Sequence, residues 1–254
     1  MSMNDALRKE SGRGALVVMP TYQEVQNIRP TLGGLLKACP AVRVLVVDDD
    51  SPDGTGGVAD AMAARDDRIS VLHRHERQGL GPAYVEGFQW ALARGYDLIC
   101  EMDMDGSHRP RDMARVLRYA QGHPEVDLVI GSRRVPGGST RNWPWYRDLI
   151  SRMGSWYARM ALGMPVRDMT AGLRAYGAPA LAGIDLTQVH SSGYVFQVDM
   201  LRRIIAGGGR VHEVPIVFVD RVRGHSKMDT GIVLEAMVQV TRWGMGRILG
   251  RSSR

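Results

Sequence analysis

The chain has few cysteines and few aromatic residues, and each scarcity excludes a class of protein. Its 254 residues include two cysteines, Cys39 and Cys100, too few for a disulfide scaffold or a cysteine zinc site. Both lie in apolar runs, so we expect buried free thiols in a reducing compartment. Aromatic residues make up 6% of the chain, and no stripe of alternating basic and aromatic residues occurs. That pattern argues against a nucleic-acid-binding surface.

Long apolar runs and two common nucleotide-binding motifs are also missing. No stretch of 18 apolar residues occurs, so we expect no membrane-spanning helix. Residues 1–13 carry several charges and no apolar segment, which predicts a flexible tail and argues against a signal peptide. Neither a Walker loop nor a Gly-X-Gly-X-X-Gly fingerprint is present, which disfavours ATPases and dehydrogenases.

The remaining composition is that of an ordinary globular chain with a basic balance. Hydrophobic residues make up 44% and charged residues 24%, which is typical of one domain at this length. The formal net charge is +6. A basic excess favours anionic partners, such as a nucleotide, a phosphate or an anionic membrane surface, without choosing among them.

Apolar, β-branched segments alternate with helical patterns along the chain. Strands are expected at residues 15–19, 42–47, 69–72, 98–102, 128–130 and 214–219. Helices are expected at residues 25–38, 57–65, 82–93, 111–119, 146–164 and 232–249. This alternation predicts an α/β fold with a mostly parallel sheet covered by helices on both faces. The Gly/Pro/Ser-rich residues 135–141 are expected to form a mobile loop.

Polar residues follow the expected strands where each strand ends. Asp103 and Asp105 end the strand at 98–102, and their i, i+2 spacing puts both carboxylates on one face. Two such carboxylates can hold one hard cation, Mg²⁺ or Mn²⁺, although this spacing is also common in turns. Asp49 ends the second strand and could accept hydrogen bonds from a nucleotide base or sugar. Parallel strands bring these ends to one edge of the sheet, where ligands bind.

A basic segment from Arg221 to Lys227 follows the last expected strand. It is either a solvated loop or a clamp for a diphosphate, because Arg offers a planar bidentate fork and Lys a mobile charge. Arg133, at another strand end, could add a third cation on the acceptor side.

Several longer motifs occur in order between residues 15 and 227. They are Pro20-Thr-Tyr-Gln-Glu24, Val47-Asp-Asp-Asp-Ser-Pro-Asp-Gly-Thr55, Asp103-Met-Asp-Gly-Ser-His-Arg-Pro110, Gly131-Ser-Arg133, Asp168-Met-Thr-Ala-Gly-Leu-Arg-Ala-Tyr176, Gly193-Tyr-Val-Phe-Gln197, Glu213-Val-Pro-Ile216 and the segment from Asp220 to Lys227. The first four resemble the core of family-2 glycosyltransferases with the GT-A fold. The later ones resemble the dolichol- or polyprenol-phosphate mannose synthases.

The resemblance implies a GDP-mannose donor, a polyprenyl phosphate acceptor and roles for individual residues. Pro20, Tyr22, Glu24, Val47 and Asp49 would contact the guanosine part of the donor. Asp103, Asp105 and the carbonyl of Met104 would hold Mg²⁺ or Mn²⁺. Arg133 would face the acceptor phosphate or the donor diphosphate, and Arg221 and Lys227 would hold donor phosphates. Asp105, Arg133, Arg221 and Lys227 are the expected catalytic set.

Two alternative functions remain open at this point. One is a polyprenol-phosphate glucosyl- or aminosugar transferase with the same fold, and the other is a non-catalytic nucleotide-binding module. A strong general base is not required, because a phosphate monoester with a second pKa of about 6 is largely dianionic at neutral pH. Asp168 and Asp199 are candidates for a base by residue type alone.

The helices expected at 146–164 and 232–249 are both amphipathic, with wide apolar faces rich in Met and Trp. Either these faces pack on the domain core, or they lie in a membrane interface with flanking arginines. We therefore expect a tail at 1–13, a GT-A catalytic domain at 14–229 that includes the first helix, and a C-terminal amphipathic helix with a basic tail at 230–254. A peripheral position on the cytoplasmic side of the membrane is expected, with an integral-membrane anchoring protein as a further possible partner.

Overall fold

The computed structural model describes residues 12–191, 193–221 and 230–248. The expected phosphate ligand Lys227 lies outside these residues. The strands are β1 (Ala15–Thr21), β2 (Arg43–Asp48), β3 (Ile69–His73), β4 (Leu98–Glu101), β5 (Leu128–Ser132), β6 (Ser139–Arg141), β7 (Arg174–Gly177), β8 (Val211–Pro215) and β9 (Val217–Val219). The helices are α2 (Ile28–Ala38), α3 (Thr55–Ala63), α4 (Leu80–Leu92), α5 (Pro110–Gly122), α6 (Trp145–Leu162), α7 (Ala178–Ala182), α8 (Gly193–Ala206) and α9 (Thr230–Ile248), with a 3-10 turn at Leu186–Gln188.

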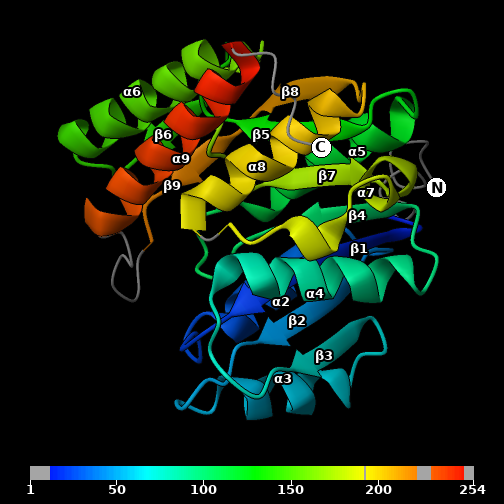
Figure 1. Cartoon of the computed structure of the whole chain (residues 1–254). Helices are drawn as coiled ribbons and strands as arrows, with labels where there is room; N and C mark the ends of the chain where they lie inside the picture. The colour runs from blue at the N-terminus through cyan, green and yellow to red at the C-terminus, as the bar shows by residue number, and fades with distance from the viewer. Residues whose placement is uncertain (1–11, 192, 222–229, 249–254) are drawn as a thin grey trace.

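Seven strands form the central sheet in the order β3-β2-β1-β4-β7-β5-β8, which rises from bottom to top in Figure 1. Neighbouring strands are parallel, except that β7 runs antiparallel to both β4 and β5. The strands β6 and β9 pair in parallel as a separate two-stranded sheet. The expected α/β fold with a mostly parallel sheet is therefore confirmed.

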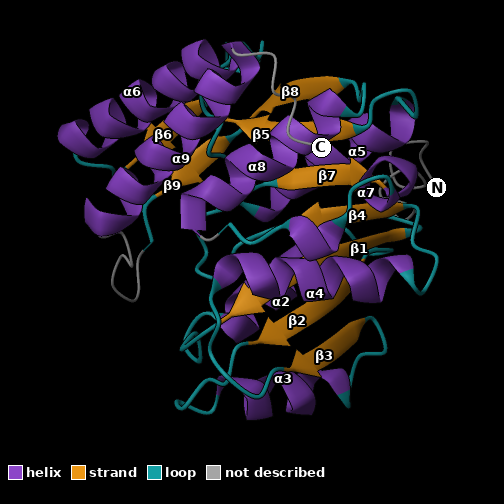
Figure 2. Cartoon of the chain, viewed as in Figure 1, coloured by secondary structure: helices purple, strands orange, loops and turns teal. Residues whose placement is uncertain are grey.

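Helices lie on both faces of the sheet (Figure 2), and an apolar core covers each face. Along β1, Leu16 and Val18 point into one core while Val17 and Met19 point into the other. Because successive strand residues alternate between faces, a strand buried on both sides must be apolar throughout. This explains the unbroken apolar runs in the sequence.

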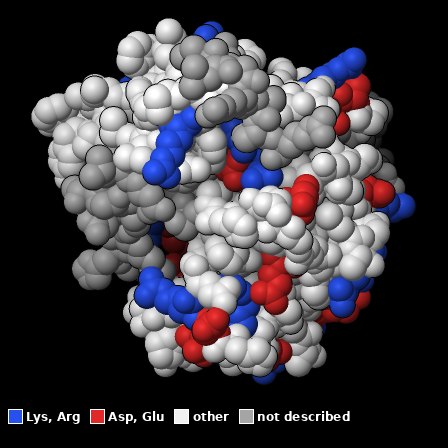
Figure 3. Space-filling model, in the orientation of Figure 1, with Lys and Arg blue, Asp and Glu red and all other residues white. Residues whose placement is uncertain are grey.

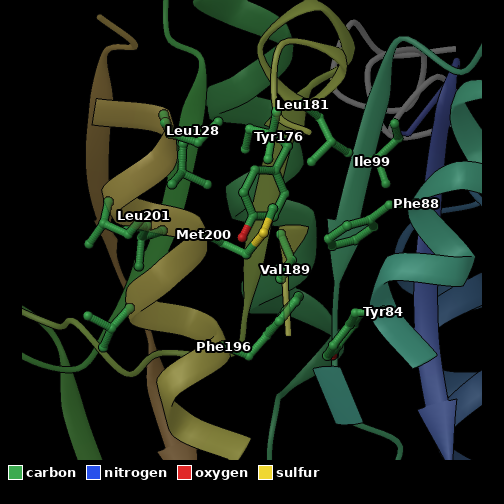
Figure 4. Packing of buried hydrophobic residues seen from close by; sticks show 14 of the residues in the cluster. Tyr84, Phe88, Ile99, Leu128, Tyr176, Leu181, Val189, Phe196, Met200 and Leu201 are labelled. Carbon is green, nitrogen blue, oxygen red and sulfur yellow. The ribbon is translucent and has the colours of Figure 1, made fainter. Parts of the chain in front are cut away.

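Aromatic residues concentrate in the first core, between α4 and α8 (Figure 4). Tyr84 of α4 stacks on Phe196 of α8 with ring centroids 5.5 Å apart. The ring centroid of Phe88 lies 5.6 Å from that of Tyr176 of β7. These contacts fix the start of α8 against the end of the sheet that carries the polar residues, and so they position the candidate site.

The structure corrects several sequence-based expectations. The strand expected at 214–219 is two strands, because the chain leaves the main sheet after Pro215 and Val217 pairs with β6. The loop expected at 135–141 contains β6. The elements β7, α7 and α8 had no counterpart in the prediction. The β7 segment Arg174-Ala-Tyr-Gly177 combines a charged residue with glycine, so it lacks the β-branched pattern of its neighbours.

The two longest of the described helices, α6 and α9, pack against each other beside the sheet (Figure 1). Gly244 of α9 allows this approach, since a Cβ atom there would lie 3.0 Å from the carbonyl oxygen of Ala161. Val240 of α9 is buried in the first core. Among the described helices, none has the combination of length and hydropathy needed to cross a bilayer.

Candidate functional site

A cleft of about 400 Å³ opens where β1, β2 and β4 end. Nine of the eleven residues expected to bind ligand or metal line it: Pro20, Tyr22, Glu24, Asp49, Asp103, Met104, Asp105, Arg133 and Arg221. Val47 does not, because its side chain is fully buried in the first core, and a ligand contact by this side chain is not supported. Lys227 is the remaining residue, and it lies outside the described part of the chain.

The paired aspartates lie at the end of β4, where a tight turn follows them. Gly106 adopts a φ of +77°, a conformation that favours glycine, and the turn lets Ser107 donate its backbone N–H to Asp105 Oδ1 at 2.9 Å. Burial, with the nearby charge of Asp105, raises the pKa of Asp103 to about 8. Two carboxylates held this close favour a bound cation over two free negative charges.

His108 binds the backbone of Asp103. The backbone N–H of Asp103 donates to Nδ1 of His108 at 3.4 Å, and burial lowers the pKa of this histidine to about 4. The imidazole is therefore neutral at physiological pH. Its ring packs edge-on against Phe218, with centroids 5.3 Å apart. His108 thus holds the turn that carries the paired aspartates without adding charge to it.

The donor set at this turn fits a hard cation that is shared with a phosphate ligand. Within the described residues, no three His, Cys, Asp or Glu side chains cluster as a complete metal site. Two carboxylates, completed by phosphate oxygens and water, are an arrangement that Mg²⁺ uses. The Met104 carbonyl, which is expected as a third ligand, accepts a hydrogen bond from Thr31 Oγ1 at 3.0 Å and keeps a second lone pair, while the Met104 side chain packs in the second core.

Asp49 lies at the other end of the cleft, but both of its carboxylate oxygens already accept hydrogen bonds from other residues of the protein. Asp49 Oδ1 pairs with the Arg74 guanidinium and accepts from the backbone N–H of Gln78 at 3.3 Å. Its Oδ2 accepts from the N–H of Gly79 at 2.9 Å. The first role of Asp49 is therefore to hold the loop between β3 and α4. That loop places the Arg77 guanidinium 4.2 Å from the centre of the Tyr22 ring.

Arg133 is held on the opposite wall by a buried ion pair with Asp168. Its Nη2 lies 2.6 Å from Asp168 Oδ1, and its Nε and backbone N–H both donate to Oδ2 at 2.8 Å. Burial works to raise the pKa of Asp168, but the Arg133 guanidinium outweighs burial and holds this pKa below its usual range. The guanidinium also lies 5.5 Å from the ring centres of Trp143 and Phe218.

Neither aspartate considered as a base is placed to act as one. Asp168 is bound to Arg133 and has no exposed surface. Asp199 accepts from Arg202, Arg203 and Ser191, and it does not line the cleft. The chemistry of this cleft therefore depends on cation placement and not on a carboxylate base supplied by these two residues.

A second, apolar cavity of about 110 Å³ adjoins the cleft. It lies among α6, α8 and α9, with apolar residues that include Ile150, Val195 and Val240. The two cavities have four lining residues in common: Arg133, Trp143, Arg147 and Thr170. The candidate site is therefore polar at the sheet edge and apolar toward the two long helices, with arginines at the boundary.

Several cleft residues were not assigned a role in ligand or metal binding from the sequence. They include Trp143, Arg147, Thr170, Gly172, Gln197 and Phe218. Thr170, Gly172 and Gln197 belong to motifs that carried the family resemblance, so their signal was present without a chemical role. Trp143 follows β6, Arg147 lies in the first turn of α6 and Phe218 lies in β9, and nothing in the sequence pattern placed these near the strand ends.

Comparison with known proteins agrees with this architecture. The family model of glycosyl transferase family 2 matches residues 16–181. An undecaprenyl-phosphate mannosyltransferase of Micrococcus luteus is 54% identical over 91% of this chain and 93% of its own. A polyprenol monophosphomannose synthase of Mycolicibacterium smegmatis is 48% identical over 93% of this chain and 89% of its own.

Solved structures share the fold at much lower sequence identity. A mannosyl-3-phosphoglycerate synthase from Rubrobacter xylanophilus superposes with a TM-score of 0.68 at 22% identity, covering 98% of this chain and 79% of its own. A Pyrobaculum calidifontis mannosyltransferase, solved with GDP-Man and Mn²⁺, gives 0.59 at 18% identity, covering 94% and 65%. At such identity the likeness speaks for the fold alone. The family match across the strand-end motifs, together with about half of all residues identical over nine-tenths of the chain, shows that this chain belongs to glycosyl transferase family 2.

Proposed function

We propose that the protein transfers mannose from GDP-mannose to a polyprenyl phosphate, giving polyprenyl-phosphate mannose and GDP. The observation that carries this proposal is the junction of the polar cleft with the apolar cavity, where Arg133 and Arg147 line both. A lipid phosphate has the same two halves, an anionic head and an apolar chain. The two relatives at 54% and 48% identity support the same acceptor and the same sugar.

The donor would lie along the sheet edge, with its nucleoside toward Pro20, Tyr22 and Glu24 and its diphosphate at the paired aspartates. Asp103 and Asp105 would hold a Mg²⁺ or Mn²⁺ ion, which when bound would neutralise the negative charge that develops on the departing diphosphate. The Pyrobaculum calidifontis mannosyltransferase was solved in complex with GDP-Man and Mn²⁺, which is consistent with this donor and metal. Arg221 and Lys227 would add positive charge to the same phosphates.

The acceptor phosphate would be the nucleophile, and Arg133 would hold it at the mouth of the apolar cavity. A phosphate monoester has a second pKa of about 6, so it is largely dianionic at neutral pH and needs no general base. The engagement of Asp168 and Asp199 in ion pairs is consistent with such a mechanism. A single in-line attack on the anomeric carbon would invert its configuration.

We also propose that α6 and α9 dock the enzyme on a membrane. The apolar face of α6 points outward: Trp145, Trp156 and Met160 are 76%, 65% and 63% exposed. On the inward side of α6, Ser155 is buried and Asp148 pairs with Arg134, while Arg152 and Arg159 are exposed. In Figure 3 the surface over α6 carries few charged side chains. A helix with its apolar face outward is typical of an interfacial helix.

Docking would place the mouth of the apolar cavity near the lipid, because Ile150 of α6 and Met237 of α9 line the cavity and are 46% and 47% exposed. We propose the cytoplasmic leaflet as the docking site. Co-sedimentation with protein-free anionic liposomes tests this. If binding requires native membranes, an integral-membrane anchoring protein is the better explanation.

The proposed reaction is tested by supplying labelled donors with undecaprenyl phosphate and Mg²⁺ or Mn²⁺. The proposal predicts transfer of label from GDP-mannose to the lipid, with much slower transfer from UDP-glucose or UDP-N-acetylglucosamine. Faster transfer from either UDP donor would favour the glucosyl- or aminosugar alternative. Binding of GDP without transfer from any donor would favour the non-catalytic module.

A further inference from the structure

One side chain in the cleft wall has a buried hydrogen-bond acceptor that nothing in the described part of the protein uses. Gln197, in the first turns of α8, lines the cleft and is only 3% exposed. Its Oε1 atom has no hydrogen-bond partner among the described residues. Leaving a buried amide oxygen without a partner costs free energy, so such atoms are uncommon unless a ligand or water completes them.

The orientation of the Gln197 amide is fixed by a buried carboxylate. Its Nε2 donates to Glu101 Oε2 at 2.6 Å, and the other Glu101 oxygen accepts from the Tyr176 hydroxyl at 2.6 Å. Burial raises the pKa of Glu101, against the opposing effects of Arg174, Tyr176 and the Gln197 amide. In its charged form this carboxylate accepts and does not donate, so the amide nitrogen faces Glu101 and the amide oxygen faces away from it. The carbonyl direction is thus set by the protein before any ligand binds.

The backbone around Gln197 is held just as firmly. The fully buried guanidinium of Arg174 donates to the Gln197 carbonyl oxygen at 2.7 Å, to Ala171 O at 2.7 Å and to Met169 O at 3.0 Å. These bonds tie α8 to the 169–171 segment and to β7. Glu101 itself lies two residues before Asp103. The unused acceptor is therefore built rigidly beside the turn that would hold the metal and the diphosphate.

The place of Gln197 in the cleft indicates what would complete its oxygen. Tyr22, Arg77 and Gly79 line the nucleoside end, while Arg133 and Trp143 line the boundary with the apolar cavity. Gln197 belongs to neither group: it reaches the cleft from α8, and its amide is bound to Glu101, next to the paired aspartates. In a nucleotide sugar, the group between the diphosphate and the acceptor is the hexose, whose hydroxyls are hydrogen-bond donors.

We propose that Gln197 is a specificity-determining residue, and that its Oε1 accepts a hydrogen bond from one hydroxyl of the transferred hexose. This inference rests on the proposed function, because it assumes that a nucleotide sugar occupies the cleft. Glu101 is then a positioning residue, which acts through the Gln197 amide. A site built to receive a hydroxyl rejects an analogue that lacks it, because the buried acceptor is left unpaired.

The test measures donor binding to the full chain, with Mn²⁺ and without acceptor. The ligands are GDP, GDP-mannose and its 2-, 3-, 4- and 6-deoxy analogues, and the proteins are the wild type, Gln197→Met and Gln197→Asn. We expect the wild type to bind one deoxy analogue about 10- to 100-fold more weakly than GDP-mannose. In Gln197→Met this difference in affinity should shrink to within about threefold, while the affinity for GDP stays the same. The change at Gln197 and the loss of one sugar hydroxyl then form a double-mutant cycle, which measures the interaction between them.

Two further variants keep the result interpretable. Gln89→Met, at an exposed position on α4, is the matched control and should leave all six affinities unchanged. Gln197→Asn keeps an amide but withdraws it by one methylene, so it should also lose the discrimination and serves if Gln197→Met does not fold. A folded variant at position 197 that still rejects the same deoxy analogue overturns the inference, as does a wild type that binds all four analogues like GDP-mannose. If the wild type binds GDP but does not bind GDP-mannose, and does not transfer mannose when acceptor is supplied, the proposed function fails and this inference with it.

Discussion

Arg221 Nη2 lies 3.1 Å from Asp105 Oδ2, so the cation expected to hold the donor phosphates is paired with a carboxylate expected to hold the metal. Both side chains are largely buried, at 23% and 9% exposed. A metal ion and a diphosphate would each satisfy one member of this pair. Binding of the donor with its metal therefore has to exchange one set of charge pairs for another, and this exchange can be measured.

Replacing Arg221 should have opposite effects on the metal and on the donor. In Arg221→Gln, Asp105 loses a competing cation, so we expect Mn²⁺ alone to bind about two- to fivefold more tightly, the size of one partly exposed ion pair. GDP-mannose should bind more weakly, because a phosphate ligand is lost. Isothermal titration with Mn²⁺ and then with the donor separates the two effects. Parallel loss of both affinities would contradict the exchange.

Metal affinity should rise with pH between 6 and 8. Burial and Asp105 raise the pKa of Asp103 to about 8, so this carboxyl is largely protonated at pH 6 in the metal-free protein. Metal binding must then displace the proton, and raising the pH removes that competition. We expect proton release on Mn²⁺ binding at pH 6.5, seen as a buffer-dependent enthalpy. An affinity that is flat from pH 6 to 8 would contradict this assignment.

Asp168→Asn should destabilise the fold, because it leaves the buried Arg133 guanidinium without its counter-charge. Loss of one partner of a buried pair costs about 3–5 kcal/mol, which urea denaturation at pH 7 can measure. Asp67→Asn is the control, since that side chain is 88% exposed.

The same pair predicts how stability depends on acid. The pKa of Asp168 is lower in the folded protein than in the unfolded chain, where it is about 3.9. The stabilisation is therefore complete above the unfolded pKa and is lost as the pH falls through the folded pKa. We expect the wild type to lose stability more steeply than Asp168→Asn on acidification below about pH 4. Equal slopes would show that this pair does not titrate on unfolding.

Removing the exposed apolar side chains of α6 should weaken membrane binding without damaging the fold. Each large apolar side chain withdrawn from water contributes about 1.5–3 kcal/mol, so Trp156→Ser should reduce liposome binding roughly tenfold or more. Trp90→Ser on α4 is the control of the same residue type, outside this surface. Co-sedimentation with anionic liposomes measures both. Equal liposome binding by Trp156→Ser and the wild type would contradict the docking proposal.

The fold could be predicted from the sequence wherever a strand is buried on both faces. β1, β2 and β4 are mostly apolar, and the polar residues that follow them include Asp49, Asp103 and Asp105 of the cleft. β7 could not be found in this way, because Arg174 is a charged residue that is buried by donating to backbone carbonyls. Such a position follows from tertiary contacts and leaves no periodic signal.

The candidate site shows the same division between local and distant information. The spacing of Asp103 and Asp105 is local, and it placed both carboxylates in the cleft. The direction of the Met104 carbonyl is not local, because it depends on Thr31 in α2. The pairing of Arg133 with Asp168 joins residues 35 positions apart, and Gln197 meets Glu101 across 96 positions. The sequence indicated which residues could bind a ligand or a metal, but it did not indicate which residues pair with one another.

The most direct test of the proposed mechanism is a transfer assay with wild type and Asp105→Asn, using GDP-[¹⁴C]mannose, undecaprenyl phosphate and Mn²⁺. The wild type should move label into the lipid phase, and chelation of Mn²⁺ should stop it. Asp105→Asn, confirmed as folded by its thermal unfolding, should lose at least about 100-fold in rate, as expected when electrostatic stabilisation of a leaving group is removed. Normal transfer by the folded variant, or no transfer by the wild type, would contradict the mechanism.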